Sequence, residues 1–127
     1  MKRIESKFKE SFYESLVRGV TGVSPDVLQL MEEALAEEKS SPAKGMLEAM
    51  LKNVELAQKL KKGVCQSPGI PCIYVRCGPE MARIDVQKIS RESIMRATRE
   101  GYLRPSIVHP LTRKNTGDNS GARHTQF

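Results

Sequence analysis

Three cysteines and one basic loop supply the residue types that could do chemistry in this chain. Cys65 lies in KGVCQSPGIPC, residues 62–72, where proline and glycine disfavour regular structure and favour an ordered turn. A cysteine held on such a loop can be a buried filler, half of a disulfide, a nucleophile or a metal ligand. The neighbouring sequence has to distinguish these roles.

The number and spacing of the cysteines argue against a structural zinc site and a disulfide framework. Cys65, Cys72 and Cys77 follow the spacing C-x6-C-x4-C, which lacks the paired C-x2-C pattern of structural zinc sites. Three is an odd number, so we expect reduced thiols in a reducing compartment. Cys72 falls in a β-prone run, where we expect a small buried side chain.

The second candidate site is the segment 103–122, which is rich in turn residues and in positive charge. Arg104, Arg113 and Lys114 surround NTGDN, residues 115–119. An arginine fork binds a carboxylate at two points, and glycine lets backbone N–H groups approach an oxyanion closely. A solvated basic loop without a ligand explains the same residue types, so both interpretations stay open at this point.

Charge and composition limit the partners. The formal net charge is +6, and residues 65–127 hold 10 Lys and Arg against 5 Asp and Glu, so we expect this half to prefer anions. Aromatic residues make up 5% and do not interleave with the basic ones, so we expect no nucleic-acid partner.

No apolar run is long enough to span a membrane, and the N-terminus, MKRIESKFKE, is too charged for a secretory signal. We therefore expect a cytoplasmic protein with no membrane partner.

The elements that must position these loops are mainly helices. Apolar residues at helical spacing predict a first helix over residues 4–17. The sequence SPD at residues 24–26 predicts the start of a second helix, and SP at residues 41–42 begins a third, which runs to about Lys61. The methionines of the third helix are expected to fill the core.

The second half of the chain is predicted to be less regular. The run CIYV, residues 72–75, predicts one short strand, and apolar spacing predicts a fourth helix over residues 86–100. The expected fold class is α+β, with a helical N-terminal layer at residues 1–61, a short strand, a further helix and an irregular site-forming C-terminal segment. We expect a single domain over residues 1–127, with the site-forming loops at residues 62–122.

Two motifs together resemble a known enzyme family. The stretch LRPSIVHPLTRKNTGDNSG, residues 103–121, and the earlier CQSPGIP, residues 65–71, resemble the iron–sulfur-dependent hydro-lyases, namely class I fumarate hydratase and L-tartrate dehydratase. The resemblance is to the N-terminal part of their alpha subunit, or alpha-type catalytic domain. It covers nearly the whole chain, and both motifs stand in the family's order and spacing.

The resemblance implies an iron–sulfur site at the cysteine loop. In the family, three cysteines hold a [4Fe-4S] cluster whose open iron acts as a Lewis acid on the substrate hydroxyl. The family's loop reads Cys-Gln-Asp-Thr-Gly, which places the first cluster ligand at Cys65 and a substrate contact at Gln66. Ser67 and Pro68 stand where the family has aspartate and threonine. We expect the loss of this carboxylate to change acid–base chemistry, hydrogen bonding or substrate choice, and Pro68 removes a backbone donor.

The same resemblance assigns roles to the basic loop. The family's arginine in the Leu-Arg segment grips a substrate carboxylate and corresponds to Arg104. The family's Asn-Thr-Gly loop, which shapes the floor of the site, corresponds to Asn115, Thr116 and Gly117. The positive charge then suits a small dicarboxylate substrate. No residue of this chain is assigned as the catalytic base, which the family takes from a separate beta subunit or a C-terminal domain.

The activity implied is reversible hydration of fumarate to malate, or dehydration of a related hydroxy-dicarboxylate such as tartrate. The family's other two cluster cysteines lie beyond the NTGDN region, so we expect this chain alone to be incompetent and to need a beta subunit. The alternative is a catalytically incomplete partner or assembly subunit of a complete hydro-lyase. Ile107, Val108 and Leu111 are expected to be exposed or to drive association into an oligomer.

Overall fold

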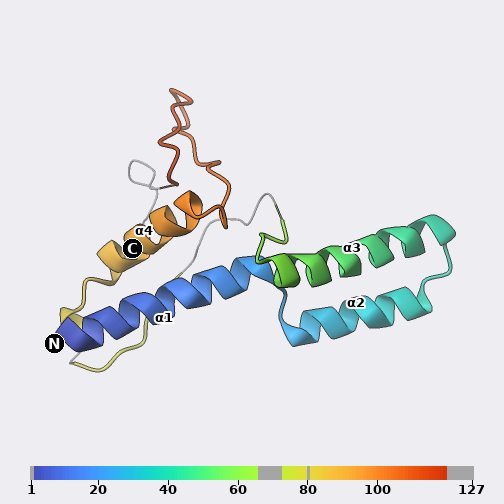
Figure 1. Cartoon of the computed structure of the whole chain (residues 1–127), viewed down its shortest axis with the longest axis horizontal. Coiled ribbons are helices and arrows are strands. Elements are labelled where there is room, and N and C mark those ends of the chain that lie inside the picture. The colour runs from blue at the N-terminus through green and yellow to red at the C-terminus, as the bar shows by residue number, and fades with distance from the viewer. Residues whose placement is uncertain (1, 66–72, 80, 120–127) are drawn as a thin grey trace.

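The structure is a computed structural model that describes residues 2–65, 73–79 and 81–119. Its helices are, in chain order, α1 (Lys2–Thr21), α2 (Pro25–Glu37), α3 (Ser41–Leu60), the short 3-10 helix η1 (Met81–Arg83) and α4 (Val86–Arg99). Figure 1 shows an elongated molecule in which α4 packs on α1 at one end, while α2 and α3 form a hairpin at the other. The predicted helices are confirmed, with ends that differ by a few residues.

The predicted α+β class is wrong, because no strand forms in the parts of the chain that the structure describes. The one sheet-like pairing there is an isolated bridge between Val108 and Asn115. The segment predicted as a strand is irregular from Ile73 onward, and Tyr74 is 95% exposed; Cys72 lies outside the described residues. A short β-prone run stays irregular when no neighbouring strand pairs with its backbone groups.

The first residues of α2, α3 and α4 explain where these helices begin. Both α2 and α3 carry proline in the first turn, where the missing N–H leaves no helical hydrogen bond unmade. The Ser24 hydroxyl makes no cap bond to α2, and instead its hydrogen bond lowers the pKa of the Asp26 carboxyl. At α4 the Asp85 carboxylate accepts a hydrogen bond from the Lys88 N–H at 2.9 Å, which fixes the first turn.

The main core forms where α4 packs against α1. Its buried side chains are Tyr13, Ile94, Ala97 and Leu103. Half-buried apolar residues of α1 surround them, namely Leu16, Val17 and Val20, together with Tyr102 after α4. Ala97 is 0% exposed, and its small side chain lets the two helices approach closely. This contact anchors the segment that follows α4.

A polar network closes the edge of this core. The Tyr13 hydroxyl donates a hydrogen bond to the Glu100 carboxylate, and Arg96 Nε contacts Glu100 Oε1 at 2.8 Å. The Arg96 guanidinium carbon lies 3.7 Å from the centroid of the Tyr13 ring, and Nη1 lies 3.2 Å from a Glu10 oxygen. Arg96 therefore joins both helices at one point.

This network gives stability a dependence on pH in the alkaline range. Burial first, and then the hydrogen bond to and charge of Glu100, raise the pKa of Tyr13 from 10.0 to about 12. Because the folded state binds the phenol proton more tightly, this stabilisation is fully present below pH 10.0 and is lost as pH rises towards about 12. Denaturant unfolding should show that the stability difference between the parent and Tyr13→Phe shrinks over this range. A difference that stays constant with pH would contradict the assignment.

The packing of α4 on α1 should contribute more to the free energy of unfolding than exposed residues of the same helices do. Ile94 is 6% exposed, so Ile94→Ala leaves a cavity beside Tyr13 and should lower the free energy of unfolding by about 3 kcal/mol. Ile4, on the same pair of helices, is 49% exposed, and Ile4→Ala should cost less than about 1 kcal/mol. Chemical denaturation of both variants measures the two values. Equal losses would show that the α1–α4 core is not where the structure places it.

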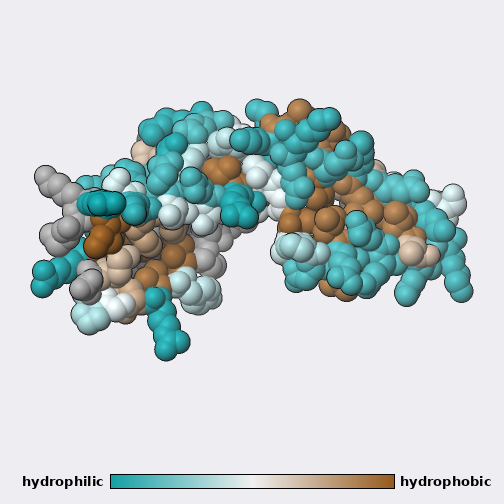
Figure 2. Space-filling view, turned by 60° about the horizontal axis from the view of Figure 1, so that its bottom comes forward, coloured by the Kyte–Doolittle hydropathy of each residue, from teal (hydrophilic) through white to brown (hydrophobic). Residues whose placement is uncertain are grey.

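The α2–α3 hairpin buries much less surface. In α3 only Val54 and Ala57 are fully buried among the described residues, while Met46 is 69% and Met50 is 51% exposed. The prediction that these methionines fill the core is therefore wrong. Each precedes an inward-facing leucine by one residue, which turns it about 100° away from α2. Figure 2 shows hydrophobic residues at the surface of the hairpin.

Candidate functional site

The backbone that leads into Cys65 is held by two helices. The Val64 N–H donates a hydrogen bond to the Val20 carbonyl oxygen at 2.9 Å, near the end of α1. The Val64 carbonyl oxygen accepts a hydrogen bond from Asn53 Nδ2 of α3, also at 2.9 Å. Cys65, the next residue, is exposed. Its backbone therefore leaves a fixed point at the junction of α1 and α3.

The same junction meets the chain that leaves α4. A Cβ atom added at Gly63 would lie 3.2 Å from the Tyr102 carbonyl oxygen, so the two backbones are close, and a side chain at residue 63 would have to push them slightly apart. Tyr102 and Leu103 both donate their N–H groups to the Ala97 carbonyl oxygen, at 2.9 and 3.3 Å. The chain thus wraps the end of α4 and brings the start of the basic loop beside the base of the cysteine loop.

Arg104 follows this turn and its side chain is exposed. The preceding residue, Leu103, is buried in the α1–α4 core, so it anchors the backbone from which the guanidinium extends. Two further cations, Arg113 and Lys114, are exposed later in the same loop. The loop from residue 104 to 119 carries these three cations against one acid, Asp118, so its field favours an anion.

The loop between Arg104 and residue 119 is ordered by its own side chains. Asn115 Nδ2 donates a hydrogen bond to the Pro105 carbonyl oxygen at 2.9 Å, and its Oδ1 accepts one from the Gly117 N–H at 2.7 Å. His109 Nδ1 accepts hydrogen bonds from the N–H groups of Leu111 and Thr112, at 3.3 and 3.2 Å. The amide of Asn115 is thereby engaged within the loop, so a structural role fits it better than direct substrate contact.

Of the other residues predicted for the site, two are exposed at the tip of the loop and one lies outside the described residues. Thr116 and Gly117 are exposed; Thr116 Oγ1 donates a hydrogen bond to Asp118 Oδ1 at 2.6 Å, and Gly117 has a φ of 77°. That backbone angle favours glycine, which explains the residue type at the tip of the loop. Gln66, predicted to contact substrate, lies outside the described residues, as do Ser67 and Pro68.

Asn119 is a site residue that the sequence analysis missed. Its side chain hydrogen-bonds to residues on both sides of Arg104, and its backbone has a φ of 56°. Asparagine is one of the few residues that tolerate this left-handed conformation. The sequence carries a signal for this conformation, because an asparagine two residues after a glycine in a turn-rich segment is a candidate for such a position.

Of the three apolar residues that were expected to be exposed or to drive association, two are exposed. Val108 is 38% and Leu111 is 87% exposed, while Ile107 is half-buried. Whether they drive association stays a prediction.

The described residues do not complete an iron–sulfur site. A cluster held by three cysteines needs three thiolates at one place. Within residues 2–65, 73–79 and 81–119, no group of three His, Cys, Asp or Glu side chains could hold a metal ion. Cys65 and Cys77 are both exposed, and Cys72 lies outside the described residues. The thiol of Cys65 is of a type that could serve as one ligand, which stays a prediction.

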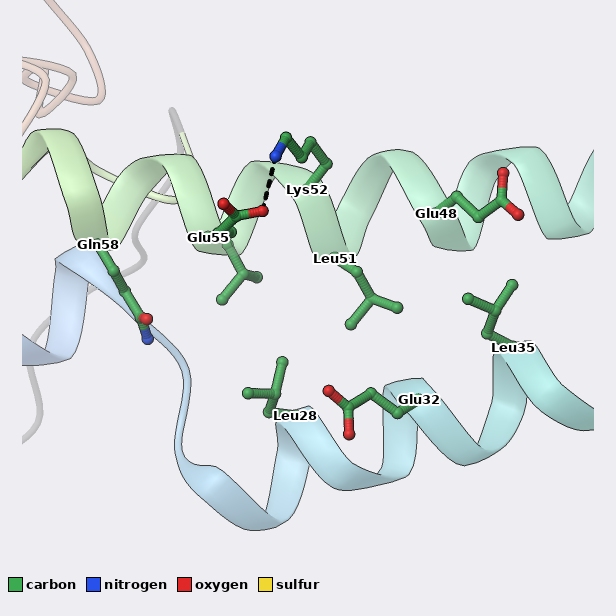
Figure 3. A pocket seen from close by; sticks show the side chains of 9 residues that line it. Leu28, Glu32, Leu35, Glu48, Leu51, Lys52, Glu55 and Gln58 are labelled. Carbon is green, nitrogen blue, oxygen red and sulfur yellow. Dashed lines mark hydrogen bonds and ion pairs between the residues drawn. The ribbon is translucent and has the colours of Figure 1, made fainter.

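Two grooves in the described structure lie away from these loops. One, of about 450 Å³, runs between α2 and α3 and is lined by leucines and by glutamates at its rim (Figure 3). Lys52 Nζ lies 2.7 Å from Glu55 Oε2 on that rim. The other, of about 270 Å³, lies between Phe8 of α1 and the segment around Cys77. Neither groove includes a residue predicted for the site.

Comparison of the sequence with known proteins identifies the family. A family model described as fumarate hydratase (Fumerase) matches residues 9–125, and the chain belongs to this family. The resemblance seen in the two sequence motifs is therefore confirmed. In the described residues, no helix is long and apolar enough to cross a membrane.

Two curated relatives show how this chain relates to longer proteins. A Methanocaldococcus jannaschii chain, provisionally named L(+)-tartrate dehydratase subunit alpha, is 35% identical over 99 residues, which are 76% of this chain and 35% of the relative. A Geobacillus stearothermophilus protein, provisionally named fumarate hydratase class I, is 29% identical over 116 residues, which are 91% of this chain and 23% of the relative. The match thus spans about a third of the first relative and about a quarter of the second.

Proposed function

We propose that this chain forms part of a hydro-lyase that acts on small dicarboxylates, by hydrating fumarate to malate or by dehydrating a hydroxy-dicarboxylate such as tartrate. The observation that carries the proposal is the meeting of Gly63 with Tyr102, which brings the bases of the cysteine loop and the basic loop together. Both activities appear in the names of the relatives. Hydration adds the oxygen of water to one alkene carbon and a proton to the other, so no oxidant or reductant is needed.

In this proposal the basic loop binds the substrate. Arg104 extends from an anchored backbone and offers two parallel N–H groups, which suit a carboxylate. Thr116 and Gly117 lie at the exposed end of the same loop and would form the floor of the site. Asn115 would hold that floor in shape through Pro105 and Gly117. Gln66, one residue beyond Cys65, would contact the substrate from the other loop.

The remaining groups come from outside the described residues. Cys65 would give one thiolate to a [4Fe-4S] cluster, which when bound supplies a Lewis acid for the substrate oxygen. The other ligands, and the base that moves the proton, would be supplied by the rest of the catalytic machinery, including a beta subunit. The name "subunit alpha" of the Methanocaldococcus jannaschii relative supports a partner of that kind.

Product analysis of the assembled enzyme tests this proposal. The enzyme that contains this chain, assembled anaerobically with its partner subunit, is incubated separately with fumarate, tartrate and a monocarboxylic acid such as crotonate. We expect malate from fumarate or oxaloacetate from tartrate, and no product from the monocarboxylate. Equal turnover of crotonate would contradict a site that selects dicarboxylates, and no product from either dicarboxylate would contradict the proposed function.

A further inference from the structure

The side chain of Asn119 ties the carbonyl group of Arg104 to the backbone that follows it. Asn119 Oδ1 accepts hydrogen bonds from the N–H groups of Ser106 and Ile107, at 3.0 and 3.2 Å. Asn119 Nδ2 donates one hydrogen bond to the Arg104 carbonyl oxygen at 2.9 Å. The amide therefore closes a loop of the chain onto itself at the residue proposed to bind substrate.

The same amide attaches this loop to α4. Asn119 Nδ2 also donates to Thr98 Oγ1 at 3.0 Å, and the Thr98 hydroxyl donates its own proton to the Ile94 carbonyl oxygen at 2.8 Å. Because that proton is already used, Thr98 Oγ1 can only accept from Asn119. Thr98 is 7% exposed, and Ile94 belongs to the α1–α4 core. The hydrogen bond to Thr98 thus fixes the position of the loop relative to a buried part of the fold.

Three separate requirements meet at residue 119. The backbone φ of 56° disfavours most residues with a side chain, and glycine would supply no amide. Aspartate has nearly the same shape, but its carboxylate would accept where Asn119 donates to the Arg104 carbonyl oxygen. Glutamine is longer by one methylene and could not place its amide on the same partners. Asparagine alone meets all three requirements.

We propose that Asn119 is the positioning residue for Arg104, and that its amide fixes the guanidinium at the distance from α4 that carboxylate binding needs. This inference rests on the proposed function, because Arg104 has a carboxylate to bind only if the enzyme acts on one. Asn119 acts through the backbone of Arg104 and does not itself contact the substrate. Its loss should weaken substrate binding more than it slows the reaction of bound substrate.

The decisive variants remove the amide without straining the backbone. Asn119→Gly keeps the φ of 56° accessible, and Asn119→Asp keeps the shape of the side chain. In the assembled enzyme, each should raise KM for the dicarboxylate by about tenfold, with a smaller change in kcat. Arg91→Ala is the control, because Arg91 is an exposed cation of α4 that belongs to neither loop of the site, and its loss leaves the amide bonds of Asn119 in place. It should change KM by less than about twofold.

A double-mutant cycle separates positioning of Arg104 from a general loss of structure. If Asn119 acts through Arg104, Asn119→Gly should raise KM about tenfold in the parent and have almost no effect in the Arg104→Ala background. Equal effects of Asn119→Gly in both backgrounds would overturn the proposal. So would an unchanged KM in the single variant.

Hydrogen exchange tests the same contacts without relying on activity. In Asn119→Gly, the Ser106 and Ile107 amide protons, which donate to Asn119 Oδ1, should exchange faster than in the parent. Unchanged protection of both protons would overturn the positioning role. An enzyme that turns over neither dicarboxylate but shows this loss of protection would instead contradict the proposed function alone.

Discussion

Replacing Cys65 by alanine should remove both the cluster and turnover from the assembled enzyme. Cys65 is the cysteine that we propose as a cluster ligand, and the backbone before it is held to α1 and α3 through Val64. Loss of one of three thiolates leaves an iron without its protein ligand, so activity should fall by at least about a thousandfold, the scale at which removal of an essential group abolishes catalysis. Iron and sulfide analysis, together with the rate of fumarate or tartrate turnover, measures the result.

Cys77 provides the matched control for this experiment. It is also exposed, and the family motif gives it no role. Cys77→Ala should therefore keep iron, sulfide and turnover within about twofold of the parent. A Cys65→Ala enzyme that retains its cluster, or a Cys77→Ala enzyme that loses it, would show that the ligand has been assigned to the wrong cysteine.

Replacing Arg104 by alanine should lower kcat/KM for the dicarboxylate by about a hundredfold, largely through a higher KM. The guanidinium is the proposed two-point partner of one substrate carboxylate, and a charge-assisted pair of this kind contributes more than a neutral hydrogen bond. Arg104→Lys should recover part of the lost kcat/KM, because lysine keeps the positive charge but cannot form two parallel hydrogen bonds to a carboxylate. Steady-state kinetics on the assembled enzyme measure kcat and KM for the parent, Arg104→Ala and Arg104→Lys.

Arg91 is the control for a simple change in net charge. It is exposed on α4, and neither the motif nor the loop geometry places it at the site. Arg91→Ala should leave kcat/KM within about twofold of the parent. If both arginine variants lose activity equally, the effect is one of overall charge, and Arg104 does not bind the substrate.

Helices could be predicted from this sequence because their signals are local. Proline in the first turn marks α2 and α3, and apolar spacing marks α1 and α4. Burial on each helix depends on what packs against it, which spacing alone does not reveal. Met46 and Met50 fit an apolar stripe, yet α2 packs only against the neighbouring face of α3, so both side chains are exposed.

The strand could not be predicted correctly from residue types. Isoleucine, tyrosine and valine at residues 73–75 are β-prone, but a strand is stabilised by its hydrogen-bonded neighbour. The part of the chain that the structure describes provides no neighbour for this run. The prediction failed because β-propensity reports how well a residue fits a sheet, and it cannot establish that a sheet exists.

The candidate site was also predictable only in part from the sequence. The motifs predict Cys65 and Arg104 as site residues, and the structure adds that Gly63 and Tyr102 bring the bases of their loops together. The role of Asn119 depends on contacts with Thr98 and with the Arg104 backbone, residues distant from it in the sequence. Such contacts are set by the folded chain, so the local pattern could mark Asn119 as a candidate for a left-handed backbone but could not reveal what its side chain binds.

The origin of the hydroxyl oxygen in the product tests the central claim most directly. The assembled enzyme is incubated with fumarate in water enriched in heavy oxygen, and the malate formed is analysed by mass spectrometry. A hydro-lyase must place one heavy oxygen in the hydroxyl group of malate, and with Arg104→Ala at low substrate the labelled malate should form about a hundredfold more slowly. If an intact, cluster-containing enzyme yields no labelled malate, and yields no oxaloacetate from tartrate, the chain does not serve the hydro-lyase chemistry proposed for it.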